Sequence, residues 1–144
     1  MIVDAHCHLW HRWPYPSTPP PGAATASALL DELAANGVDR ALVVAAAIGG
    51  EDARTQNLRN NDDVAEAVHD HRDQLRMVAD IDSRWSAGYH RPGAAARLAD
   101  EIARTGARGF THYLGDTDDG WLDTADGTDF FSAAESLGLL ATVH

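Results

Sequence analysis

Short apolar runs recur along this chain at intervals of about 30 to 40 residues, and the stretches between them have the pattern of amphipathic helices. The runs are typical of buried strands. Strands are predicted at Met1 to Ala5, Arg40 to Ala46, Arg76 to Ile81, Ala107 to Leu114 and Leu139 to His144. Strands that alternate with helices form a parallel sheet, because each crossover returns the chain to the same end of the sheet.

Four helices are predicted between these strands. The expected ranges are Ala26 to Asn36, a helix that starts at Asn61, a helix from Pro92 to Thr105, and a helix from Thr128 to Leu137. Asn61 and Thr128 are the expected N-terminal caps, and Pro92 suits a first helical position, where its missing N–H costs nothing. Glycines at 37, 106 and 138 are expected to end three of the helices.

This order of elements is compatible with two α/β architectures, an open doubly wound sheet or a little more than half of an eightfold barrel. A dinucleotide-binding sheet would carry a glycine-rich turn after its first strand, whereas the residues there are AHCHLWHRW. No linker or low-complexity segment divides residues 1–144, so one domain is predicted.

Composition excludes several classes of function. Acidic residues outnumber arginines 22 to 11, lysine is absent and the formal charge is −11, so we expect no nucleic-acid partner. No apolar run has the roughly 20 residues that cross a bilayer, and no signal peptide is evident, so a cytoplasmic protein is expected. The single cysteine, Cys7, excludes an internal disulfide, and a metal would have to be bound by histidines and carboxylates.

Three polar side chains mark the end of the first strand. Asp4, His6 and His8 are spaced two residues apart, so in a strand they share one face. His144 ends the fifth strand at the same level, and three histidines from two strands would form a zinc-type site with positions open for water or substrate. Asp4 either orients a ligand histidine or only caps the strand end.

Two further groups are candidates for contact with a substrate. His112 and Tyr113 are neighbours in the predicted fourth strand and point to opposite faces, so only one of them can line a barrel. Trp10, His11 and Arg12, in the loop after the first strand, can frame a pocket for an anionic or hydroxylated substrate.

Four segments together resemble the amidohydrolase-related metal-dependent hydrolases, a family of (β/α)8 TIM barrels. They are IVDAHCHLW, similar to the family's first-strand D-x-H-x-H motif, NGVDRALVV, GARGF, and LGLLATVH, similar to its fifth strand. The resemblance implies metal contact by His6, His8 and His144. The most similar branch includes sugar lactonases, pyrone-dicarboxylate lactonases and aminocarboxymuconate-semialdehyde decarboxylase, and the H-L-W ending favours the lactonase-like members.

The chain also departs from this pattern. Members of the family are about twice as long, and their sixth-strand histidine and eighth-strand aspartate have no counterpart here, so we expect strands 1 to 5 of a longer barrel. If the chain were whole, closure by a second copy or another chain is expected. Lysine, the bridging residue of two-metal members, is absent, which implies one divalent ion, zinc or manganese. Some relatives use the same histidines without metal, so a metal-free site stays open.

These observations predict a hydrolase that opens a small lactone, carboxylic ester or amide through a metal-activated water. Two alternatives remain: a nonoxidative decarboxylase that uses the same site, and a catalytically inactive half-barrel that acts as a binding module. The candidate catalytic residues are Asp4 and His112, and the candidate substrate contacts are Trp10, His11, Arg12 and Tyr113. The expected partners are a small-molecule substrate and, as one option, further copies of the chain.

Overall fold

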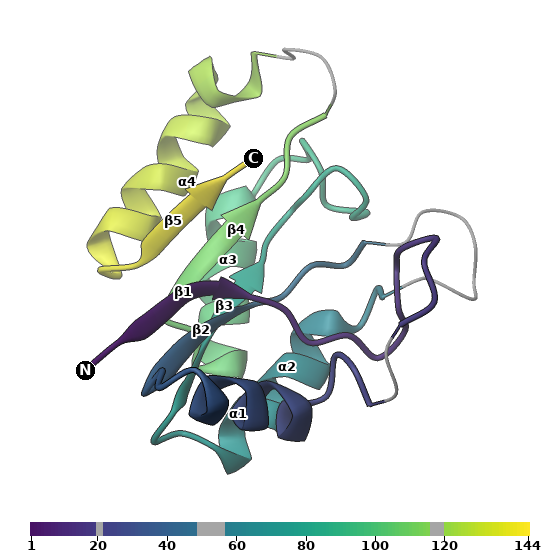
Figure 1. The fold of residues 1–144 in the computed structure, drawn as a ribbon. Coiled ribbons are helices and arrows are strands. Elements are labelled where there is room, and N and C mark those ends of the chain that lie inside the picture. The colour runs from purple at the N-terminus through teal and green to yellow at the C-terminus, as the bar shows by residue number, and fades with distance from the viewer. Residues whose placement is uncertain (20–21, 49–56, 116–119) are drawn as a thin grey trace.

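The computed structural model describes residues 1–19, 22–48, 57–115 and 120–144. Within these ranges, five strands alternate with four α-helices (Figure 1). The elements are β1 (Val3–Cys7), α1 (Ala26–Ala35), β2 (Arg40–Val44), α2 (Asn60–Asp70), β3 (Leu75–Asp80), α3 (Ala94–Thr105), β4 (Gly109–His112), the short 3-10 helix η1 (Trp121–Asp123), α4 (Ala125–Ser136) and β5 (Leu140–Val143).

The strands form one parallel sheet in the order β1-β2-β3-β4-β5, which confirms the predicted topology. One continuous core joins this sheet to all four helices through Leu33, Val64, Leu98 and Phe130. A doubly wound sheet would carry helices on both faces, whereas here the helices share one face and the sheet curls between its edges, β1 and β5 (Figure 1). The architecture is therefore a half-barrel.

Two predicted helix starts and one predicted helix cap were wrong. Gly93, at φ 88°, is the N-cap of α3, so the helix begins at Ala94 and Pro92 stays outside it. Helix α4 begins three residues earlier than predicted, because the hydroxyl of Thr124 accepts a hydrogen bond from the Gly127 N–H and caps it. Helix α2 begins at Asn60, and the Asn61 side chain binds strand β3 instead of capping the helix.

In the GARGF segment, Gly109 allows β4 and β5 to approach closely because it has no side chain. A Cβ on Gly109 would lie 2.6 Å from the Leu140 carbonyl oxygen and 2.8 Å from the Leu140 Cβ, so any larger side chain would force the strands apart. This close approach sets the position of His144, which directly follows β5.

None of the helices in the described residues has both the length and the apolar character needed to cross a membrane.

Candidate active site

A pair of histidines lies at the carboxyl end of β1. Nε2 of His6 and Nε2 of His8 are 3.1 Å apart, while the Cys7 thiol between them points the other way and donates to the Leu42 carbonyl. Burial raises the pKa of this thiol to about 12, so it stays protonated. The alternation predicted from the sequence is thus the alternation of the folded strand.

The His8 ring is oriented by the neighbouring strand. Its Nδ1 lies 2.7 Å from the Val44 carbonyl oxygen at the end of β2. A carbonyl only accepts, so Nδ1 carries the proton and, in the neutral ring, Nε2 has a lone pair that accepts the hydrogen bond from His6 Nε2. Burial lowers the pKa of His8, and the nearby His6 and His144 lower it further, which favours this neutral form.

His144 approaches the pair from the other edge of the sheet. Its ring centroid lies 5.7 Å from that of His6, and its backbone N–H donates to the His112 carbonyl, which extends the β4–β5 pairing. The imidazole stacks on the ring of Tyr113, with centroids 4.6 Å apart and planes 15° apart. The curled sheet therefore gathers three histidines from its first and last strands.

The histidine pair has the spacing of two metal ligands. Nitrogens bound at 2.0–2.1 Å to one tetrahedral zinc ion lie about 3.3–3.4 Å apart, close to the 3.1 Å between His6 and His8. Across residues 1–19, 22–48, 57–115 and 120–144, no group of three or more His, Cys, Asp or Glu side chains converges closely enough to hold a metal. The His6 and His8 pair fits two ligand positions, and His144 stands beside it as the third histidine.

Asp4 serves the backbone of its own strand. Its Oδ1 accepts a hydrogen bond of 2.9 Å from the His6 N–H, at the irregularity where pairing with β2 shifts register. Of the two roles considered for Asp4, this contact matches a cap at the strand end, and it supports His6 through the main chain. A catalytic role for the Asp4 carboxylate remains a prediction.

His112 and Tyr113 point to opposite faces, and it is Tyr113 that faces the histidines. His112 is fully buried on the helix side of β4, where it packs on Trp121 and Phe130 and its Nδ1 donates to the Ile81 carbonyl. Burial lowers the pKa of His112, which favours the neutral ring. The structure therefore separates His112 from the histidine pair.

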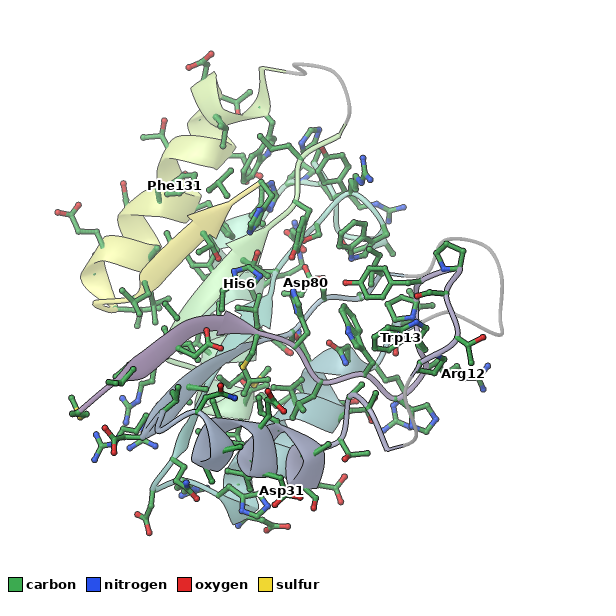
Figure 2. All side chains as sticks on the ribbon, in the orientation of Figure 1. His6, Arg12, Trp13, Asp31, Asp80 and Phe131 are labelled. Carbon is green, nitrogen blue, oxygen red and sulfur yellow. The ribbon has the colours of Figure 1, made fainter. Side chains whose placement is uncertain are left out.

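The loop after β1 divides into a near part and a far part. Trp10 stacks on His8, with ring centroids 4.9 Å apart, and so borders the pair directly. His11 and Arg12 are exposed, and Figure 2 shows Arg12 beside Trp13, well away from His6. Of the three loop residues predicted to contact substrate, the structure brings Trp10 to the histidine pair and leaves His11 and Arg12 exposed to solvent.

A buried carboxylate at the end of β3 escaped the sequence analysis. Asp80 (Figure 2) accepts hydrogen bonds from the Ala47 N–H at 2.6 Å, from the Trp85 indole N–H at 2.9 Å and from the Ser83 hydroxyl. Burial raises its pKa despite these donors. Trp85 in turn packs on Tyr113, at 4.7 Å between centroids. The available signal was position, since Asp80 closes the apolar run of the third strand.

A cavity of about 400 Å³ opens beside Asp80, between α2 and α3. Its lining includes the ion pair between Asp82 and Arg97, whose Nη2 and Oδ2 atoms are 2.7 Å apart, and it also includes Glu101. This cavity lies on the helix side of the sheet, whereas the histidines lie on the other face.

Comparisons with known proteins identify the family and the fold. The sequence model of a family described as Amidohydrolase matches residues 3–144. A search of the curated proteins found no match. Among solved structures, a probable 2-pyrone-4,6-dicarboxylic acid hydrolase from Acinetobacter baumannii, with citric acid bound, is 18% identical with a TM-score of 0.64, and the alignment covers 99% of this chain and 49% of that one.

A second solved structure, PhdJ bound to a substrate intermediate, is 19% identical with a TM-score of 0.44, over 99% of this chain and 42% of that one. The likeness to the hydrolase concerns the fold, and it confirms the predicted (β/α)8 type, with strands β1 to β5 present. The chain spans about half the length of that structure.

Proposed function

Because this chain belongs to the amidohydrolase family, we propose that it forms part of a hydrolase that opens a small lactone, carboxylic ester or amide. His6, His8 and His144 are the proposed ligands of one divalent ion, zinc or manganese. When bound, such an ion supplies Lewis-acid chemistry, which polarises a carbonyl and makes water more acidic. The preference for a lactone draws on the activity named for the similar pyrone-dicarboxylic acid hydrolase.

One observation carries this proposal, the facing Nε2 atoms of His6 and His8 at 3.1 Å. The hydrogen bond from His8 Nδ1 to Val44 keeps the proton off His8 Nε2, so this lone pair, which accepts from His6 Nε2 in the structure, is the one that would bind a ligand; this is the usual arrangement of a metal-binding histidine. The lowered pKa of His8 acts in the same direction, because a protonated imidazole cannot bind metal.

The remaining side chains are proposed to hold the substrate. Trp10 and Tyr113 place aromatic surface beside His8 and His144 and can pack against a flat ring. Asp80 fixes the indole of Trp85, and Trp85 supports Tyr113, so this wall of the site is held from behind. Its rigidity would keep the reacting carbonyl oriented toward the histidines.

The test uses the purified full-length protein, its His6→Ala/His8→Ala variant and a matched control, His69→Ala/His71→Ala. The control removes two histidines at the same spacing from the region of α2. Metal content by elemental analysis and hydrolysis of a lactone panel, including 2-pyrone-4,6-dicarboxylate, are measured together.

We expect about one ion per chain in the wild type and the control, and its loss from the His6/His8 variant with a fall in hydrolysis of about 100-fold or more. Metal retained by that variant would overturn the ligand assignment. Release of carbon dioxide without ring opening would replace hydrolysis with decarboxylation.

A further inference from the structure

Three asparagines at the start of α2 bind the segments that follow the strands. Asn57, Asn60 and Asn61, here called the asparagine clamp, each use the side-chain amide as both donor and acceptor toward main-chain groups. A carboxamide presents one C=O and one NH₂, so it can replace a missing peptide group between two strands. Only asparagine has this pair of functions at this reach.

Two members of the asparagine clamp each bind both main-chain groups of one residue. Asn57 accepts from the Arg12 N–H at 3.0 Å and donates to the Arg12 carbonyl at 2.8 Å. Asn61 does the same with Asp80, at 2.8 Å in both directions. These contacts attach α2 to the loop after β1 and to the end of β3.

Asn60 instead joins the segments that follow two different strands, β1 and β2. It is fully buried, accepts from the Ala46 N–H at 2.8 Å and donates to the Leu9 carbonyl at 2.9 Å. The last paired residues of β1 and β2 are Cys7 and Val43. Beyond that point, the Asn60 amide bridges the two segments that follow these strands.

The bridge flanks the contact that orients His8. Leu9 directly follows His8, and Ala46 lies two residues after Val44, whose carbonyl receives the His8 Nδ1–H. The distance between these two segments decides whether the hydrogen bond of 2.7 Å from His8 Nδ1 to the Val44 carbonyl can form.

We propose that Asn60 is a positioning residue for His8. By bridging Leu9 to Ala46, it keeps the His8 ring hydrogen-bonded to the Val44 carbonyl, in the Nδ1–H tautomer, whose unprotonated Nε2 faces His6. Its meaning for metal binding rests on the proposed function, but the tautomer itself does not. Loss of Asn60 would free the His8 ring to adopt the other tautomer.

The experiment is histidine nitrogen NMR on the metal-free protein at pH 8, where two-bond ¹H–¹⁵N spectra distinguish the tautomers. Samples are the wild type, Asn60→Ala and the control Asn61→Ala, with His8 signals assigned from a His8→Ala sample. The control breaks a comparable pair of hydrogen bonds, but to β3, and also one to Glu101 on α3. Thermal unfolding of each sample separates loss of stability from loss of orientation.

In the wild type we expect His8 as the Nδ1–H tautomer. In Asn60→Ala the ratio of Nε2–H to Nδ1–H should rise about three- to tenfold, the factor for losing one ordinary hydrogen bond, and Asn61→Ala should match the wild type. If Asn60→Ala does not fold, Asn60→Asp supplies the same readout, because its carboxylate still accepts from Ala46 but repels the Leu9 carbonyl.

An unchanged His8 spectrum in a folded Asn60 variant, or an equal change in Asn61→Ala, would overturn the proposal. Zinc affinity by titration is the second readout, with about tenfold weaker binding expected in Asn60→Ala. If the wild type binds no zinc, the proposed function fails while the tautomer result still decides the role of Asn60.

Discussion

Among the arginines of the described residues, Arg97 on α3 is the one whose replacement is expected to destabilise the fold most. Its Nε and Nη2 atoms donate to Asp82 at 2.7–3.0 Å, and the same guanidinium donates to the carbonyls of Gly88, Arg91 and Pro92. The Arg97 side chain therefore neutralises the Asp82 carboxylate and fixes the loop between β3 and α3 by hydrogen bonds. Arg97→Met keeps the aliphatic stem and removes every one of these donors.

The magnitude follows from burial. The Asp82 side chain is 8% exposed and that of Arg97 is 36% exposed. Removing one partner of a buried pair costs about 3–5 kcal/mol, and solvent screening at the half-exposed arginine reduces this, so we expect Arg97→Met to lower the free energy of unfolding by about 2–3 kcal/mol. Asp82 has φ 50°, a conformation that asparagine tolerates, so Asp82→Asn removes the charge without new backbone strain.

Urea unfolding of the wild type, both single variants and the double variant measures the coupling. We expect the double variant Asp82→Asn/Arg97→Met to be more stable than the sum of the single changes predicts, by about 1 kcal/mol or more, because the uncompensated buried carboxylate is gone. Additive effects, or a cost below about 0.5 kcal/mol for Arg97→Met, would refute the reasoning from burial.

Three further predictions concern the strands, the core and pH. Gly109→Ala should destabilise by about 1–3 kcal/mol, because the new Cβ would meet Leu140, and thermal unfolding with no loss would contradict this. Phe130→Ala, at a fully buried site, should cost about 3–5 kcal/mol in urea unfolding. Because the pKa of Asp80 is raised in the folded state, its protonated form contributes stability below the unfolded pKa, near 3.9, and this contribution is lost as pH rises through the folded pKa. The stability of Asp80→Asn relative to wild type should therefore increase from about pH 4 to pH 7.

The sequence predicted the sheet well because strand order follows from alternation alone. Each buried run is followed by a helix, and a helix long enough to return the chain leaves little choice but parallel neighbours. The helix starts were harder, since Pro92 and Thr128 carry good local signals that the fold does not use. Helix α3 instead starts after the left-handed residue Gly93, and α4 starts after Thr124, whose hydroxyl caps it.

The site was predictable where chemistry follows the period of a strand. The spacing of His6 and His8 fixed their common face, and period two required His112 and Tyr113 to diverge. Which of these two faces the histidines depends on where α4 packs, and local sequence does not encode that. The asparagine clamp was invisible for the same reason, because its partners lie up to 51 residues away, as for Asn60 and Leu9.

The central claim is that His6 and His8 share one metal ion. Anomalous diffraction at the zinc edge, from crystals of the protein grown with zinc, tests it most directly. We predict a single strong peak about 2.0–2.1 Å from Nε2 of both residues, with the His144 ring turned toward it. A map without a peak between the two rings, in crystals where zinc binds elsewhere on the surface, would contradict the claim.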